Sequence, residues 1–207
     1  MFPLATSPYA EQMKRWPQSG QHILAQFDDD TIIVYQAYRP EIGKFAVEKS
    51  YFGGEFKYSR MSWIKPNFLW MMYRSDWGQS EGQDVVLAVR LKRTFFDSLL
   101  AQAVPSSFDP SVFGSRDEWA GAVANSDVRR QWDPDHFPTG EKCERRAIQL
   151  GLRGPALESY GKREIVQIID MTAFVAEQRS NINEWQNGKL ITPTEYVYVP
   201  GNWTDAQ

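Results

Sequence analysis

The segment MSWIKPNFLWMMYRSDWG, residues 61–78, places aromatic rings and cations close together. Trp63 and Trp70 offer flat apolar surfaces that fill either a core or a ligand cleft. Lys65 stands between a predicted buried strand and a predicted buried helix, so its charge needs an anion or a route to the surface. Arg74 can pair with a nearby acid or clamp a phosphate through two hydrogen bonds. The pattern suits a ligand that combines flat rings with phosphate.

Side chains for other chemistries are scarce. His22 and His136 are more than a hundred residues apart and Cys143 is the only cysteine, so no zinc-ligand spacing exists. The acids at 28–30 lack the alternation of a calcium loop. The sequence has no G-x-S-x-G, no P-loop and no G-x-G-x-x-G after a strand. We therefore predict no metal site and disfavour ordinary hydrolases, kinases and Rossmann oxidoreductases.

Cleavage of the bond between nicotinamide and ribose in NAD needs few titrating groups. Nicotinamide leaves as a neutral molecule because its ring is cationic in NAD, so no strong general acid is required. The ribose passes through an oxocarbenium-like state, as in glycoside hydrolysis. The protein must grip the dinucleotide, stack the nicotinamide and set a carboxylate or another polar group against the sugar. Aromatic rings and a few polar anchors suffice.

Composition limits the class of protein. The chain has 207 residues, 42% of them hydrophobic and 24% charged, which suits one folded soluble domain. A net charge of −3 disfavours binding of long duplex DNA, but not of a single base or a tRNA end. No apolar run approaches the roughly 20 residues of a membrane helix, and the start lacks a secretory pattern. We expect a cytoplasmic protein with no membrane partner.

The elements that position these residues alternate between strand and helix. We expect an N-terminal arm at 1–25 and a single α+β domain at 26–207. Strands are predicted within 28–38, 60–66, 84–93, 145–152, 163–172 and 195–200. Helices are predicted within 40–52, 66–77, 93–104, 115–126, 154–161 and 174–185, and a turn-rich loop at 131–138. Alternation along the first strand puts Gln36 and Tyr38 on one face.

Several phrases match a known family pattern. DDDTIIVYQAY, RMSWIKPNFLWMMYRSDWG, FDPSVFGSRDEW, RRQWDPDH and RAIQLGLRG resemble domain of unknown function family 4291. Together they cover most of residues 25–175. The chain is identified as a member of that family, which brings no established activity.

The order of the motifs also resembles that of ADP-ribosyltransferases, including the DarT-like group that modifies DNA. TIIVYQAYRPEIGKFAVEKSYFGG is similar to their opening strand, helix and glycine-bearing turn, and residues 60–77 are similar to the strand and helix that follow. Many such families have a histidine or arginine where this chain has Gln36, which hydrogen-bonds but carries no charge. REIVQIIDMT resembles the late strand that often carries a catalytic glutamate. That glutamate is Glu164 here, with Glu195 as an alternative.

The resemblance implies an ADP-ribosyltransferase-like fold with a mixed split β-sheet and flanking helices. It implies an enzyme that uses NAD as substrate and transfers ADP-ribose to a nucleic acid, a protein or a small molecule. The implied catalytic residues are Gln36, Lys65 and Glu164. The implied cofactor-binding residues are Tyr38, Arg60, Trp63, Trp70 and Arg74.

Two other classes of function stay open. A module that binds a nucleotide or nucleic acid without catalysis would use the same cleft, and neither glutamate would matter. A structural partner would expose a large apolar patch in place of a closed pocket.

Overall fold

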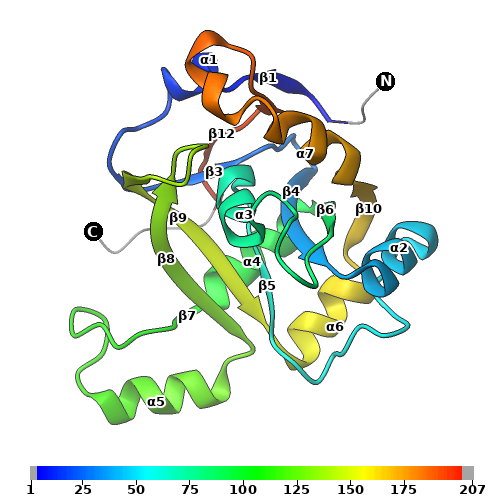
Figure 1. Cartoon of the computed structure of the whole chain (residues 1–207). Coiled ribbons are helices and arrows are strands. Elements are labelled where there is room, and N and C mark those ends of the chain that lie inside the picture. Colours follow the sequence, from blue (N-terminus) through cyan, green and yellow to red (C-terminus); the bar gives the residue numbers. More distant parts are fainter. Residues whose placement is uncertain (1–3, 202–207) are drawn as a thin grey trace.

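Two long apolar runs form the centre of the first half-sheet. TIIVYQAY folds as β4 (Thr31–Tyr38), VVLAVRLK folds as β6 (Val85–Lys92), and the two pair in antiparallel register along their whole length. β10 (Ile165–Asp170) pairs antiparallel with the other edge of β6. The computed structural model, which describes residues 4–201, has these strands on the right of Figure 1.

The second half-sheet is built on a long curved hairpin. β8 (Val128–His136) and β9 (Lys142–Leu152) form this hairpin, and β5 (Ser62–Ile64) pairs antiparallel with the other side of β9. Two short strands, β2 (Gly20–Gln21) and β7 (Val104–Pro105), extend its edges in parallel orientation. Parallel and antiparallel pairs therefore occur in one half-sheet, so the sheet is mixed.

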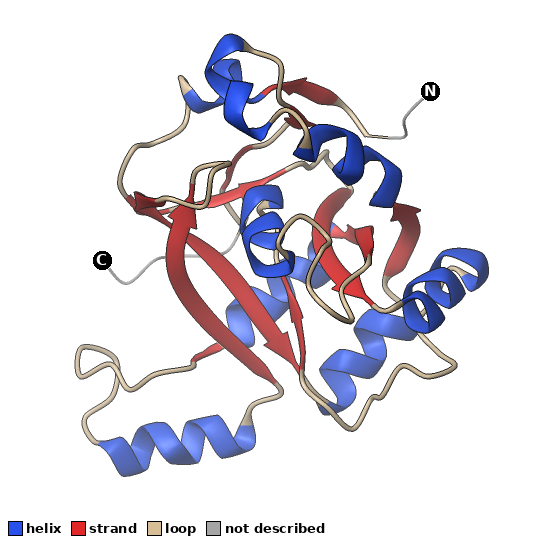
Figure 2. Ribbon diagram, viewed as in Figure 1, coloured by secondary structure: helices blue, strands red, loops and turns tan. Residues whose placement is uncertain are grey.

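The two half-sheets meet between β4 and β5. Tyr35 N–H donates to the carbonyl of Lys65 at 2.7 Å, and Lys65 N–H donates back at 3.3 Å. On either side of this bridge the half-sheets curl away from each other, as Figure 2 shows. The result is an α+β domain with one curled, split sheet.

Helices cover both half-sheets. The helices are α1 (Tyr9–Met13), α2 (Pro40–Lys49), α3 (Phe68–Ser75), α4 (Arg93–Gln102), α5 (Arg116–Asn125), α6 (Gly154–Lys162), α7 (Thr172–Arg179) and the 3-10 helix η1 (Ile182–Asn187). α3 packs against both β4 and β8, so the tryptophan-rich helix lies between the half-sheets (Figure 2). A proline in the first turn starts both α2 and α6, as the sequence predicts.

Two apolar clusters bury both faces of β4. Ile32 and Val34 belong to a cluster with side chains of α2, α4 and α6. Ile33 and Tyr35 belong to a second cluster with side chains of α3 and α7. Burial on both faces explains why this strand reads as a nearly continuous apolar run.

The segment expected as an N-terminal arm lies on the domain from residue 4 onward, and residues 1–3 fall outside the described part. Short strands tie it to the last elements: β1 (Thr6–Pro8) pairs with β11 (Ile191–Pro193), and β3 (Ile23–Ala25) pairs with β12 (Tyr196–Tyr198). Tyr9 and Trp16 are buried between them. The arm therefore contributes to the core.

The prediction of a loop at 131–138 is wrong, because most of this segment belongs to β8. Pro134 suggested a turn, since proline cannot donate a ladder hydrogen bond. Here β7 pairs with β8 only at Arg129 and Arg130, which leaves the edge of β8 free beside Pro134. A bulge follows between Pro134 and His136.

Glu195 anchors the start of α3. Its Oε1 accepts the Phe68 N–H at 2.7 Å, and its Oε2 accepts the Asn67 side-chain amide at 3.3 Å. Asn67 also caps the helix, because its Oδ1 accepts the Trp70 N–H at 2.6 Å. Burial raises the pKa of Glu195, which is 2% exposed. Glu195, the alternative catalytic glutamate, is therefore a buried helix anchor.

Substitution of Glu195 tests this anchor. We expect Glu195→Ala to lower the free energy of unfolding by about 2 kcal/mol, because buried donors at a helix start lose their acceptor. Glu158→Ala, which removes an exposed pair with Lys162, serves as the control and should cost less than about 0.5 kcal/mol. Urea unfolding measures both; equal losses would contradict the anchoring role.

Candidate functional site

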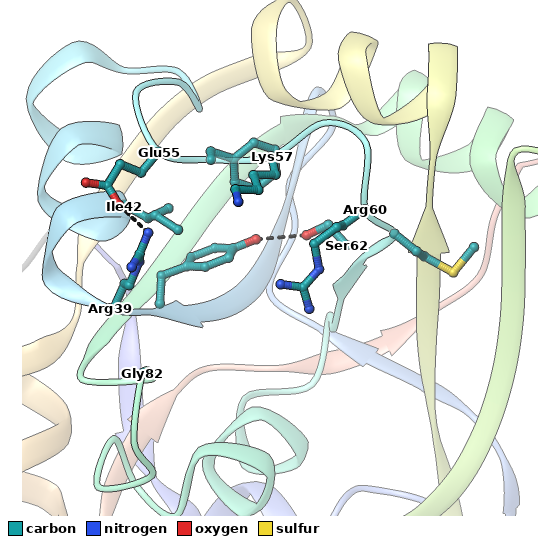
Figure 3. A pocket seen from close by; sticks show the side chains of 10 residues that line it. Arg39, Ile42, Glu55, Lys57, Arg60, Ser62 and Gly82 are labelled. Atoms are coloured by element: carbon teal, nitrogen blue, oxygen red, sulfur yellow. Dashed lines mark hydrogen bonds and ion pairs between the residues drawn. The ribbon is translucent and has the colours of Figure 1, made fainter.

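A pocket of about 500 Å³ opens where β4 and β5 separate beyond the bridge. We call it the split pocket. Its walls come from the end of β4, the start of α2, the loop at 50–61 and the tip of the loop that precedes β6 (Figure 3). Its lining residues are Tyr38, Arg39, Ile42, Glu55, Phe56, Lys57, Arg60, Met61, Ser62 and Gly82.

Positive charge dominates the split pocket. Arg39 pairs with Glu55, the one carboxylate in the lining. Lys57 and Arg60 form no ion pair and no side-chain hydrogen bond within residues 4–201, and both head groups point into the hollow in Figure 3. Two uncompensated cations at the rim of a concave site attract an anion.

The wall between the two strands is a chain of hydrogen bonds. The Tyr38 hydroxyl is bonded to Ser62 Oγ at 2.8 Å, and Gln36 Nε2 donates to the same oxygen at 2.8 Å. Gln36 Nε2 also donates to the Trp63 carbonyl at 3.1 Å, and Gln36 Oε1 accepts the Tyr160 hydroxyl at 2.5 Å. Burial raises the pKa of Tyr38, so its hydroxyl stays protonated.

These bonds show how Gln36, a predicted catalytic residue, is held in the structure. At 3% exposure its amide is engaged by protein groups on both ends. Both N–H donors of the amide are engaged and only the second lone pair of Oε1 stays open, on a side chain that is almost fully buried. Gln36 therefore braces the wall of the split pocket behind Tyr38 and Ser62.

Alternation along β5, β9 and β8 puts several polar side chains on one face of this half-sheet. Trp63 lies opposite Gly151, whose missing side chain leaves room for the indole ring: a Cβ there would come within 2.9 Å of it. β5 pairs with β9 as far as Ile64, which lies opposite Leu150, and alternation puts Lys65 on the same side as Trp63. On the neighbouring strands, Gln149 lies opposite Gln131. We define the polar face as Trp63, Lys65, Gln131, Asp133 and Gln149.

Lys65 is buried on this face at 6% exposure. Its Nζ donates to the Trp63 carbonyl at 3.5 Å, and no described carboxylate lies within ion-pair distance. Burial and the nearby charge of Arg74 lower the pKa of Lys65 to about 7, although Asp133 acts in the opposite sense. A neutral amine can serve as a base or a nucleophile near neutral pH.

Arg74 and Trp70 occupy different environments on α3. Arg74 is exposed, and no Asp or Glu within residues 4–201 forms an ion pair with it. Its charge acts on Lys65. Trp70 is 5% exposed and stacks on His136 at 5.4 Å and on Tyr73 at 5.4 Å. Trp70 is therefore part of an interior ring stack and lines neither the split pocket nor the polar face.

The structure does not bring Glu164 to either region. Its carboxylate pairs with Lys92 at 3.1 Å, at the end of β6. The register places Tyr38 beside Val85, at the opposite end of the same strand. Seven residues of extended chain separate these ends by about 23 Å. Glu164 is therefore an ion-pair residue at the far edge of the first half-sheet.

Asp133 belongs to the polar face, and the sequence interpretation missed it. Its oxygens accept the amides of Gln131 and Gln149, each at 2.7 Å. Polar residues at every second position, Gln131 and Asp133, would have indicated one face of a strand. The loop assignment of this segment hid that alternation.

Residues 4–201 contain neither a candidate metal site nor a candidate membrane-spanning helix. No group of three or more His, Cys, Asp or Glu side chains in this range is placed to hold a metal ion. Within the same residues, no helix has the length and apolar character needed to span a membrane.

The pH dependence of stability tests the burial of Lys65. Its folded-state pKa lies below its unfolded value, so the unfolded chain binds more protons between pH 7 and 9. The free energy of unfolding of the wild type should therefore rise by about 2 kcal/mol over this range relative to Lys65→Met. Denaturant unfolding at several pH values measures the difference. A difference that stays flat from pH 7 to 9 would show an amine open to solvent.

The family comparison agrees with the sequence motifs. The family model described as "Domain of unknown function (DUF4291)" matches residues 22–198, which run from β3 through β12 and include the split pocket and the polar face. No curated protein matches the chain. The match confirms the resemblance found in the motifs, and the chain belongs to the DUF4291 family.

Proposed function

We propose that this protein binds NAD along the split pocket and the polar face and transfers its ADP-ribose to an acceptor. One observation carries the proposal. Lys57 and Arg60 point without partners into an open pocket that has an aromatic wall, at the place where the sheet divides. NAD supplies a pyrophosphate for the cations and flat rings for the aromatic side chains.

The charges of the pocket favour a phosphate over a carboxylate or a neutral ligand. Arginine binds phosphate oxygens through two parallel hydrogen bonds, and lysine adds a point charge. Tyr38 and Phe56 supply ring surface beside these cations. The volume lies within the usual range for small-molecule pockets.

The length of the site favours a dinucleotide. Met61 lines the split pocket, and alternation along the extended segment 61–65 puts Trp63 and Lys65 on the same side as Met61. Four residues of extended chain from Met61 to Lys65 span about 13 Å. A ligand that holds its pyrophosphate at Arg60 and reaches Lys65 must be longer than a mononucleotide.

The architecture also supports an ADP-ribosyltransferase-like fold. That resemblance calls for a split sheet, with the ligand cleft where the first two strands meet the tryptophan-rich helix. β4 and β5 separate beyond the bridge between Tyr35 and Lys65, and α3 packs against both half-sheets. The lining of the split pocket comes from β4, α2, the loop at 50–61, Ser62 and Gly82, so the pocket lies beside the strands and away from α3. In this proposal the acceptor is a nucleic acid, a protein or a small molecule.

A second candidate function is a module that binds a nucleotide without cleaving it. The observation that favours it is the position of the two glutamates, since Glu164 pairs with Lys92 and Glu195 anchors α3. This module would bind NAD and release no nicotinamide. The transferase would release nicotinamide when its acceptor, or water, is present.

Removal of a pocket cation tests the proposal. Arg60→Ala should weaken NAD binding at least tenfold, about 1.4 kcal/mol, because one charged contact to phosphate is lost. Arg163→Ala is the matched control, since Arg163 is exposed and lies outside the lining of the pocket. Isothermal titration calorimetry with NAD measures both variants. Failure of the wild type to bind NAD, or equal affinities for the two variants, would refute the assignment.

A further inference from the structure

We infer that Asp133 is the carboxylate that stabilises the positive charge on the ribose during the proposed transfer. The inference rests on the proposed function and concerns a residue outside the glutamates that the sequence suggested. The observation behind it is that two aspartates of β8, Asp133 and Asp135, have different partners.

Asp133 and Asp135 lie two residues apart on β8 but have different partners. Asp135 is neutralised by Arg145, whose Nε and Nη2 donate to the same Asp135 oxygen at 2.8 and 2.6 Å. Asp133 has no cation within ion-pair distance among residues 4–201, and side-chain amides hold its two oxygens. The fold therefore compensates one carboxylate and leaves the other with its charge.

The two amides fix the Asp133 carboxylate without neutralising it. Gln131 donates to Oδ1 and Gln149 to Oδ2, both at 2.7 Å. A carboxylate accepts about four hydrogen bonds, so each oxygen keeps a free lone pair. A charge held rigidly before the ligand arrives stabilises a developing cation with little reorganisation.

The position of Asp133 suits a contact with a ligand. The side chain is half-buried on the polar face, and its cross-strand neighbour is the small residue Ala147. Lys65 lies close enough for the Asp133 charge to act on its amine. A dinucleotide that runs from Arg60 past Trp63 therefore brings its far ribose toward Asp133 and Lys65.

The chemical step balances with the groups on this face. The bond between C1 of the ribose and the nicotinamide nitrogen breaks, and its electron pair stays on that nitrogen, which gives neutral nicotinamide. Asp133 faces the oxocarbenium-like ribose while this bond opens. The acceptor then forms a bond to C1, and its proton passes to the amine of Lys65.

The test compares two substitutions that each remove one negative charge. Asp133→Asn keeps the size of the side chain, and Glu164→Gln is the matched control at the Lys92 ion pair. NAD affinity is measured by calorimetry, and nicotinamide release is measured by chromatography. We expect Asp133→Asn to bind NAD within about threefold of the wild type and to release nicotinamide at least 100-fold more slowly. Glu164→Gln should match the wild type in both measurements.

The results distinguish failure of the proposed function from failure of the inference about Asp133. If the wild type neither binds nor cleaves NAD, the proposed function falls and this inference falls with it. If Asp133→Asn cleaves NAD within threefold of the wild-type rate, or Glu164→Gln alone loses turnover, only the inference is overturned. Asp133→Ser provides a second variant without the charge, and thermal unfolding checks that each variant is folded. Loss of turnover in a folded Asp133→Ser that still binds NAD would support the inference.

Discussion

Two backbone hydrogen bonds between Tyr35 and Lys65 hold the half-sheets together and fix where they separate. Beyond this bridge, the ends of β4 and β5 are linked through side chains, with Tyr38 and Gln36 both bonded to Ser62. A fully paired ladder would close the space that forms the split pocket. The same bridge fixes the backbone of Lys65, whose side chain is buried at 6% exposure.

Several charged groups in the proposed site lack ion-pair partners within residues 4–201, whereas the neighbouring Asp135 is paired. Asp135 pairs with Arg145, whereas Asp133 has neutral amide partners, Lys65 has a carbonyl, and Arg60 points into open space. Uncompensated charge costs stability, so its concentration in one region is the pattern expected of a functional site. Glu195 contributes by holding the start of α3, the helix that carries Arg74 toward Lys65.

Local sequence patterns predicted the helices and strands better than they predicted which strands pair with each other. The apolar runs at 31–38 and 85–92 indicated β4 and β6 correctly, and the prolines at 40 and 155 indicated the starts of α2 and α6. Lys65 was expected to need an anion or a route to the surface. The carboxylate whose charge acts on it, Asp133, lies on β8, a segment that Pro134 made look like a loop. The position of Glu164 beside Lys92 could not be foreseen, because only the register of β10 on β6 shows at which end of the sheet it lies. Strand pairing between distant segments carries that information, and a local pattern does not.

A crystal structure of the protein with NAD bound would test the central claim most directly. We expect the pyrophosphate against Lys57 and Arg60 in the split pocket, and the nicotinamide-bearing ribose on the polar face beside Asp133. NAD seated elsewhere on the molecule, with both regions free of ligand, would contradict it.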